Sequence, residues 1–190
     1  PAWSSAWIDF PIRDELARVF PWERIAVDDT VRALGVAEAR YGHGRGAGDF
    51  AYVMADTGIG AALMLGNRPY IGPGRIAGEL GHVTLDPGGE LCGCGRRGCL
   101  ETVASSSALR RRGRAIVGES ALSLPELCRR ADDGDEALRA LLTASGAALG
   151  RGIAVLLNLL APRLVVVGGA ATSSPYYVDA AVAAAREQAL

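Results

Sequence analysis

Four potential metal ligands lie close together in the sequence. His82 is followed by Cys92, Cys94 and Cys99, which are three of the four cysteines in the chain. One imidazole and three thiolates are the ligand set that a closed, structural zinc site prefers. The intervening glycines permit tight turns, so the thiolates can converge on one ion. The sequence therefore predicts a Zn²⁺ site in a loop over residues 82–101; the alternative is a glycine-rich turn with reduced thiols and no metal.

Two carboxylates flank these ligands. Glu79 precedes His82 by three residues, and Glu101 follows Cys99 by two. A metal-bound histidine presents its second ring nitrogen in a fixed orientation, so that nitrogen can face a ligand. Carboxylates form strong, charge-assisted hydrogen bonds with hydroxyl groups. The loop can therefore position acidic groups around a polar ligand, unless these two residues are simply solvated.

The composition limits the classes of function. The chain has 190 residues and a net charge of −1, which gives no global electrostatic argument for nucleic-acid binding. Cysteines in a metal-type cluster fit a reducing, cytoplasmic environment better than a disulfide-linked secreted protein. We find no apolar run of about 18 residues and no signal peptide, so we expect no membrane association. The start at Pro1 reads like an internal piece of something longer.

The pattern of apolar residues predicts an alternation of strands and helices, and hence an α/β architecture. The segment 56–60 reads as a hairpin turn between two strands, and residues 42–48 and 70–78 as glycine-rich loops. A continuous apolar run at 164–167 predicts a strand buried on both faces. Strands are expected at 22–27, 50–55, 61–65, 82–85 and 164–167. Helices are expected at 10–20, at 30–41, from the serines 105–107 through 114, from a capping box at 123–126, after 135 to 161, and from about 176; Asp28, Asp29 or Thr30 can cap the second of them.

These motifs resemble those of the ROK family (repressor, open reading frame, kinase). The family carries a Glu-x-Gly-His segment and a Cys-x-Cys-Gly-x-x-Gly-Cys-x-Glu loop, which match residues 79–82 and 92–101 here. Segments 7–11, 27–38, 57–60 and 165–169 follow in the order that the family would give them. The resemblance implies an actin-like ATPase (ribonuclease-H-like) α/β fold with two lobes. Residues 1–190 would form a partial ROK domain, with 1–29 ending the N-terminal lobe and 30–190 forming the C-terminal lobe.

The resemblance also implies a sugar site next to the zinc loop. By the family pattern, Glu79, His82, Glu101 and Asp29 would bind a sugar or sugar phosphate. Family members are sugar kinases or sugar-responsive transcription regulators. For a regulator we expect a homo-oligomer, most simply a dimer, which contacts DNA only through a domain absent from this chain.

Asp29 and Thr30 bear on the choice between kinase and regulator. In the kinases an Asn-Asp pair opens a helix, and the Asp is the general base for the attacking sugar hydroxyl. Counting back from Glu38 places the family Asn on Asp29 and the Asp on Thr30. A threonine hydroxyl cannot act as a base near neutral pH. A shift of one residue in this correspondence would instead let Asp29 act as the base.

The segment 57–60 resembles the turn that holds nucleotide phosphate in the kinases. The residue before it is usually glycine there and is Asp56 here, and a carboxylate repels a phosphate. Residues 168–169 could border a nucleotide or only allow tight packing. The arginines at 110–114 read as a solvated helix face rather than a nucleic-acid site.

We therefore expect the effector-binding and oligomerisation region of a ROK transcription regulator, with no catalytic residue. The alternatives are a zinc-containing ROK sugar kinase that phosphorylates hexoses with ATP, and a zinc-stabilised scaffold without a ligand.

Overall fold

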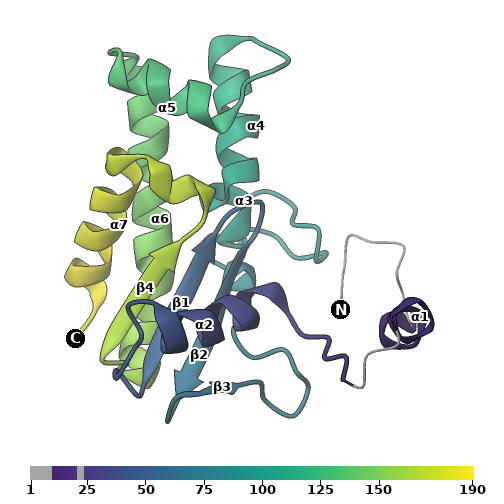
Figure 1. The fold of residues 1–190 in the computed structure, drawn as a ribbon. Helices are drawn as coiled ribbons and strands as arrows, with labels where there is room; N and C mark the ends of the chain where they lie inside the picture. Colours follow the sequence, from purple (N-terminus) through teal and green to yellow (C-terminus); the bar gives the residue numbers. More distant parts are fainter. Residues whose placement is uncertain (1–9, 21–23) are drawn as a thin grey trace.

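A four-stranded mixed sheet lies at the centre of the computed structural model, which describes residues 10–20 and 24–190. The strand order is β3-β2-β1-β4, where β1 is Phe50–Ala55, β2 is Ile59–Leu65, β3 is Arg68–Tyr70 and β4 is Leu164–Gly168 (Figure 1). The neighbours β1 and β2, and β2 and β3, are antiparallel, whereas β1 and β4 are parallel. The predicted hairpin is confirmed, with β2 beginning two residues earlier than expected.

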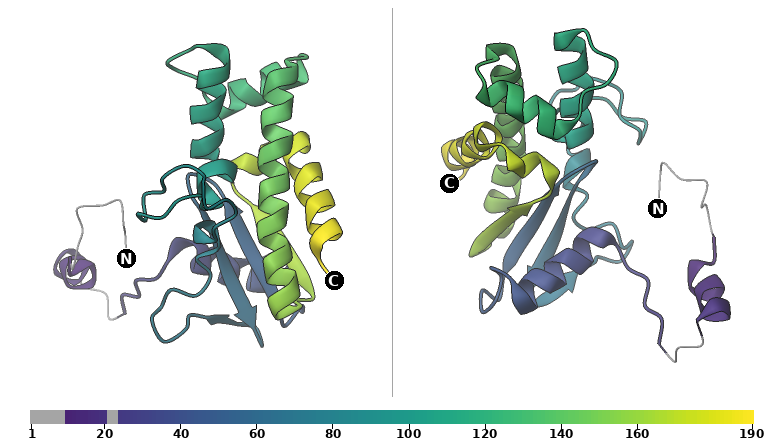
Figure 2. Two further views of the ribbon diagram at one scale, coloured as in Figure 1. Left: turned by 180° about the vertical axis from the view of Figure 1, so that it is seen from behind. Right: turned by 45° about the horizontal axis from the view of Figure 1, so that its top comes forward.

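Helices cover both faces of this sheet, in agreement with the alternation of side chains along a strand. Phe50 and Tyr52 of β1 pack with Val31 of α2 (Thr30–Tyr41) on one face. Ala51 and Val53 face the larger core, which includes α6 (Glu136–Leu160) and α7 (Pro175–Gln188). The view from behind shows α6 and α7 side by side across this second face (Figure 2).

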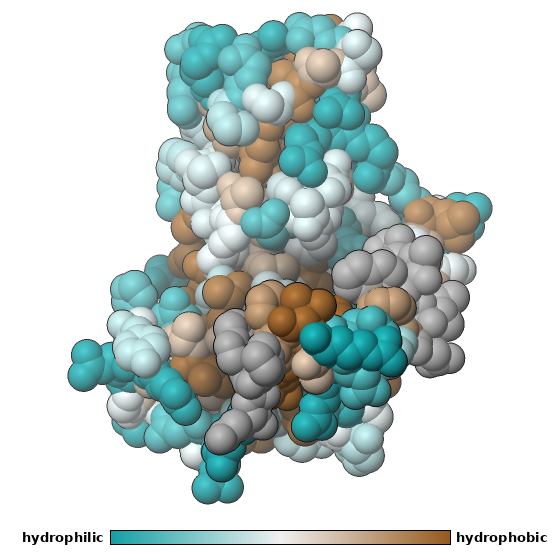
Figure 3. Space-filling model, turned by 45° about the vertical axis from the view of Figure 1, so that its right-hand side comes forward, coloured by the Kyte–Doolittle hydropathy of each residue, from teal (hydrophilic) through white to brown (hydrophobic). Residues whose placement is uncertain are grey.

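The remaining helices extend beyond the sheet. They are α3 (Glu101–Ala104), α4 (Ser106–Val117) and α5 (Leu124–Asp132), with the short 3₁₀ helices η1 (Leu80–His82) and η2 (Ala170–Ser173). The tip formed by α4 and α5 is mainly hydrophilic (Figure 3). Helix α1 (Ile12–Val19) stands apart from the sheet and buries none of its residues (Figure 1).

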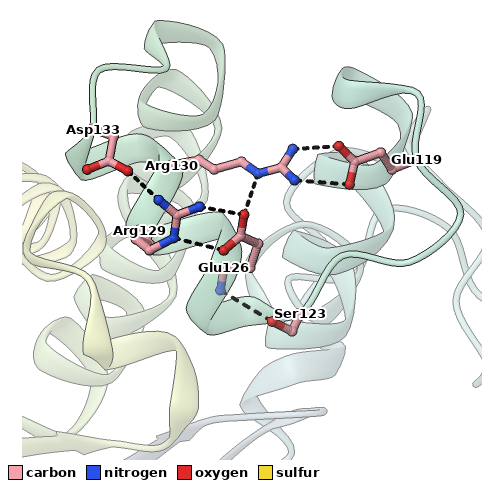
Figure 4. A network of polar contacts seen from close by, with 6 residues as sticks. All are labelled: Glu119, Ser123, Glu126, Arg129, Arg130 and Asp133. Carbon is pink, nitrogen blue, oxygen red and sulfur yellow. Dashed lines mark hydrogen bonds and ion pairs between the residues drawn. The ribbon is translucent and has the colours of Figure 1, made fainter.

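Arginine–glutamate pairs tie α5 to the end of α4. Arg130 donates to both Glu119 and Glu126, and Arg129 donates to Glu126 and Asp133 (Figure 4). The two arginines lower the pKa of Glu126 to about 2. Ser123 accepts the Glu126 N–H at 3.3 Å, so it caps α5 as predicted. The side chain of Glu126 is turned towards the arginines, so only this half of the expected capping box is seen.

Several sequence predictions about elements are wrong. The described part of the expected strand at 22–27, residues 24–27, forms no strand; residues 22 and 23 fall outside the described range. The expected strand at 82–85 is reduced to one isolated bridge from Thr84 to Cys99, after η1. The strand β4 lies at the sheet edge and is only half-buried. The short strand β3 was not predicted.

The long helix α6 contradicts the expectation that the chain has no apolar run long enough to cross a membrane. It includes a window that is long and apolar enough to cross a membrane by length and composition alone. In this fold 56% of that window is buried. Its apolar residues pack against the sheet and α7, as in the central helix of an α/β core.

Candidate functional site

The four predicted metal ligands come together in space. The His82 Nδ1 atom lies 3.7 Å from the Cys92 Sγ atom, and the Sγ atoms of Cys94 and Cys99 lie 3.6 Å apart. All four ligand atoms lie within 4.8 Å of one another. Cys92 and Cys99 are buried, whereas His82 and Cys94 are half-buried. The sequence prediction of a single cluster is therefore confirmed for these side chains.

The spacing of these atoms fits a tetrahedral ion. With Zn–S bonds of about 2.3 Å and a Zn–N bond of about 2.0 Å, a regular tetrahedron separates sulfur atoms by about 3.8 Å and nitrogen from sulfur by about 3.5 Å. The separations of 3.6 and 3.7 Å lie close to these values. Three sulfurs and one nitrogen favour zinc over magnesium or calcium, which prefer oxygen ligands. The donor set and its geometry thus fit a structural zinc ion.

Short backbone contacts shape the loop around the cysteines. The Cys92 N–H donates to the Arg96 carbonyl, and the Leu85 N–H donates to the Gly98 carbonyl. At Gly98 φ is +69°, and a Cβ atom there would lie 1.5 Å from the Asp86 carbonyl oxygen. Only glycine can bring the backbone this close in this conformation. Gly98 therefore fixes the approach of Cys99 to the other ligands.

The half-buried Cys94 and the buried Cys99 differ in acidity. A hydrogen bond from the Arg96 backbone, assisted by its side chain and the neighbouring cysteines, lowers the pKa of Cys94 to about 6. Burial, together with the adjacent thiols, raises the pKa of Cys99 to about 12. A metal must therefore displace a proton from Cys99 when it binds near neutral pH, because only thiolates ligate.

The second ring nitrogen of His82 faces Glu79, one of the residues predicted to bind a sugar. The His82 Nε2 atom lies 3.8 Å from the Glu79 Oε2 atom, while Nδ1 faces the cysteines. The Glu79 side chain is 49% exposed, so its carboxylate remains accessible. An ion at Nδ1 would fix the imidazole plane and present Nε2 beside a free carboxylate. This pair can bind a hydroxyl group.

Glu101 lies against the turn between β1 and β2. Its Oε2 atom accepts the Ile59 N–H at 3.0 Å. A Cβ atom at Gly58 would lie 2.5 Å from that same oxygen, so the glycine leaves room for the carboxylate. One carboxylate oxygen is thus held by the backbone. We find Glu101 at the edge of a cavity of about 300 Å³, which also contacts Thr57 and Glu90.

The beginning of β2 brings the other predicted site segments together. Gly78 and Gly81, on either side of Glu79, approach the carbonyl groups of Ala61 and Ile59 so closely that a Cβ would overlap them. Gly60 lies against Val31 in the first turn of α2. The helix start, the Glu79–His82 segment and Glu101 therefore all pack around one short stretch of backbone.

Asp29 caps the helix that follows it. Its Oδ1 atom accepts the N–H groups of Val31 and Arg32 at 2.9 and 3.1 Å, and Thr30 is the first helical residue. No hydrogen bond to Oδ2 is found among the described residues. The predicted helix boundary is confirmed, and of the three residues that could cap the helix it is Asp29 that does so; one of its two carboxylate oxygens is hydrogen-bonded to the backbone.

Sequence reasoning missed the ion pairs that hold these segments. Asp28 Oδ1 accepts from Arg32 Nε at 2.8 Å, and Arg75 reaches the same oxygen at 3.4 Å. Arg32 also donates to the Arg75 carbonyl, which links α2 to the loop before Glu79. The hydrogen bond from Arg32 is the main reason that the pKa of Asp28 is lowered. The four-residue spacing from Asp28 to Arg32 was the available signal.

The role of Glu90 was also not predicted from the sequence. It lies in the cysteine loop and forms ion pairs with Arg111 and Arg112 of α4. Burial opposes its ionisation, but the hydrogen bonds and charges of these arginines lower the pKa of Glu90 overall. Arg111 also donates to the Thr102 carbonyl at 2.9 Å. Part of the arginine run thus anchors the loop rather than forming only a solvated face.

The known proteins that are similar to this chain include both a transcription regulator and a sugar kinase. The ROK family profile matches residues 2–190. The DNA-binding transcriptional dual regulator NagC of Escherichia coli K12 is 31% identical over 156 residues, which cover 78% of this chain and 38% of NagC. The N-acetylmannosamine kinase of E. coli O157:H7 is 34% identical over 164 residues, covering 85% of this chain and 54% of that kinase.

A solved structure gives the same result for the fold. The ROK hexokinase of Thermus thermophilus superposes with a TM-score of 0.86 and 34% identity, covering 95% of this chain and 62% of the hexokinase. The chain thus spans about two fifths to three fifths of the length of these relatives.

Proposed function

Because the chain belongs to the ROK family, we propose that it is the effector-binding and oligomerisation region of a sugar-responsive transcription regulator. It would lack kinase activity. Its residues would form the C-terminal lobe from 30 to 190 and the end of the N-terminal lobe up to 29, in an actin-like arrangement of two lobes. DNA contact would require a domain outside this chain, as in a full-length regulator.

The observation that carries this proposal is the start of α2. Asp29 is the N-cap and Thr30 the first helical residue, so the position that we assign to the kinase base holds a hydroxyl group. A neutral threonine cannot accept the proton of a sugar hydroxyl at neutral pH. The hydrogen-bonding part of the site does not need that base. The arrangement therefore favours binding of a sugar over its phosphorylation.

Zinc would organise the sugar site. His82, Cys92, Cys94 and Cys99 would hold the ion, which would supply structural rigidity to the loop. His82 and Glu79 would then bind adjacent sugar hydroxyls, with Glu101 on the other side. Asp29 would contribute its Oδ2 atom, since Oδ1 is occupied by the helix start. Charge-assisted bonds to several hydroxyls give both affinity and orientation.

Regulation would follow from unequal binding. A sugar shifts an equilibrium between lobe arrangements only when it binds one arrangement more tightly. The ligand groups come from α2, the segment before η1 and the start of α3. A sugar that contacts all three would favour the arrangement in which they are closest. In a homodimer this shift could be passed to DNA-binding domains.

One specific observation favours the alternative, an ATP-dependent sugar kinase. Asp29 Oδ2 has no hydrogen-bond partner among the described residues, so a carboxylate oxygen is available at the helix start. If the family correspondence shifts by one residue, this atom is placed to act as a base. The similarity to N-acetylmannosamine kinase and to the hexokinase supports the kinase alternative as much as the similarity to NagC supports the regulator.

A binding and phosphorylation assay separates the two functions. Purified zinc-loaded protein is incubated with hexoses, N-acetylhexosamines and their 6-phosphates, first alone and then with labelled ATP and Mg²⁺. We expect at least one sugar to raise the melting temperature, by preferential binding to the folded state, without formation of labelled sugar phosphate. Phosphorylation at an ordinary enzymatic rate, abolished by Asp29→Asn, would establish the kinase instead. No thermal shift with any sugar would favour the scaffold.

A further inference from the structure

Arg32 is an almost fully buried arginine in the first turn of α2, and the proposed function does not yet give it a role. Its side chain is only 10% exposed. Two nitrogens of its guanidinium group contact the same Asp28 Oδ1 atom, Nε at 2.8 Å and Nη2 at 2.7 Å. A buried charge requires partners of this kind. The positive charge therefore lies where the helix begins, three residues after the candidate sugar ligand Asp29.

Arg32 holds Asp29 in two ways. The Asp28 Oδ1 atom that Arg32 contacts also accepts the Asp29 N–H at 2.9 Å. The Asp29 Oδ1 atom in turn accepts the Arg32 N–H at 3.1 Å. The backbone of Asp29 is thus tied to the guanidinium group through Asp28, and its carboxylate is tied to the Arg32 backbone. With both held, the direction of the remaining Oδ2 atom is fixed.

The third guanidinium nitrogen of Arg32 holds the loop that precedes Glu79. Its Nη1 atom donates to the Arg75 carbonyl at 3.3 Å, and the Arg75 side chain reaches Asp28 Oδ1 at 3.4 Å. The φ angle of Arg75 is +56°, in the left-handed region that is uncommon for residues other than glycine. Such a conformation persists only where the surroundings hold it. Arg32 supplies one of these contacts.

The other end of this loop is fixed on the sheet. The Gly78 carbonyl accepts the Ala61 N–H at 2.7 Å, and a Cβ atom at Gly78 would lie only 1.8 Å from the Ala61 carbonyl oxygen. Glu79 follows directly. The segment before Glu79 is therefore held at two points, by β2 next to Glu79 and by Arg32 next to Asp29. Two candidate sugar ligands thus share one frame, and its α2 end depends on one side chain.

We propose that Arg32 is a positioning residue for the candidate sugar site, which acts through Asp28 and the Arg75 carbonyl to direct the Asp29 Oδ2 atom and to fix it relative to Glu79. Arg32 does not itself touch the ligand. This inference rests on the proposed function and adds a residue that determines sugar affinity from outside the site. Lysine is no substitute, because an ammonium group lacks the planar fork that holds one carboxylate oxygen and a carbonyl together.

The test is calorimetry of zinc-loaded wild type, Arg32→Lys and Asp28→Ala with N-acetylglucosamine, N-acetylmannosamine, glucose and the 6-phosphate of each. We expect either substitution to weaken binding of the sugar that wild type binds by about fivefold or more. The double variant should lose little more than the single variants, because both residues act along one path and their effects are not additive.

A second background separates positioning from a general structural role. Asp29→Ser keeps a hydroxyl group that can cap the helix, but it removes the oxygen that Arg32 directs. In this background Arg32→Lys should weaken sugar binding by less than about twofold. Hydrogen exchange gives a readout without sugar: the Asp29 N–H should exchange faster in Arg32→Lys and in Asp28→Ala than in wild type.

Arg130→Lys is the matched control. Arg130 also pairs with a carboxylate four residues earlier, that of Glu126, and with the more distant Glu119, but it lies on α5. This variant should retain wild-type sugar affinity and wild-type exchange at Asp29.

Wild-type sugar affinity in folded Arg32→Lys and Asp28→Ala would overturn the inference while leaving the proposed function intact. An equal loss from Arg32→Lys in the wild-type and Asp29→Ser backgrounds would also overturn it, because the role of Arg32 would then be structural only. If Arg32→Lys does not fold, Asp28→Ala decides by the same criteria, since the Asp28 side chain is 43% exposed. A wild type that binds no sugar would instead refute the proposed function, and this inference with it.

Discussion

Three glycines in the cysteine loop allow the metal site to be tested by alanine substitution. Gly93 has no atom within 4 Å of an added Cβ, and its φ is not positive. Gly95 has the same free space but a φ of +86°. Gly98 combines a φ of +69° with an added Cβ only 1.5 Å from the Asp86 carbonyl oxygen. The series separates an unstrained position, backbone strain alone, and strain with overlap.

The expected magnitudes follow from these differences. Gly93→Ala should leave zinc affinity unchanged. Gly95→Ala forces a non-glycine residue into the left-handed region at a cost of about 1–2 kcal/mol, which weakens binding about 5- to 30-fold. At Gly98 the overlap is with backbone that cannot rotate away, so overpacking adds about 1–3 kcal/mol. The total of about 2–5 kcal/mol corresponds to roughly 30-fold to a few-thousand-fold weaker binding.

Competition with a chromophoric zinc chelator measures this series directly. Each variant is titrated at one pH, because metal uptake by thiols releases protons. The predicted order of affinity is Gly93→Ala, then Gly95→Ala, then Gly98→Ala. If Gly98→Ala bound zinc as tightly as Gly93→Ala, the loop geometry described above would not determine the metal site, and the reasoning would be wrong.

Three further predictions concern single side chains. Glu101→Gln removes the charge beside the candidate sugar site and should weaken sugar binding at least tenfold in calorimetry, because charge-assisted bonds are about twice as strong as neutral ones; unchanged affinity would remove Glu101 from the site. Tyr177 is fully buried and donates to the Ala104 carbonyl at 2.7 Å, so Tyr177→Phe should lower the free energy of unfolding by about 1–3 kcal/mol, whereas Tyr41→Phe, at an 81% exposed residue, should not. The pKa of Glu126 is lowered from 4.5 to about 2, so its contribution to stability is present above pH 4.5 and is lost as the pH falls towards 2. Urea unfolding should show that Glu126→Gln reduces this pH dependence; an identical slope in both proteins would contradict the assignment.

Local sequence signals predicted much of the fold. The boundary of α2 was correct, and Asp29 was among the three residues expected to be able to cap it, because an N-cap needs only a side chain two or three residues from the amide that it accepts. The four metal ligands were predicted for a similar reason, since soft ligands at close spacing are rare without a metal. The hairpin was recognisable from its turn residues.

What the sequence could not reveal depends on contacts between distant segments. The strand β4 looked fully buried because its residues are apolar, but its place at the sheet edge follows from topology. The bond from Asp56 to Ala170 joins residues 114 positions apart, so no local pattern predicts it. The ion pairs of Glu90 also join separate segments, because α4 places two arginines beside the cysteine loop.

X-ray absorption at the zinc edge of the purified protein is the most direct test of the central claim that the imidazole and three thiolates hold one ion. We predict stoichiometric zinc with one nitrogen at about 2.0–2.1 Å and three sulfurs at about 2.3 Å, and loss of one sulfur in Cys94→Ser. A spectrum without zinc, or one that shows oxygen ligands alone, would contradict the claim.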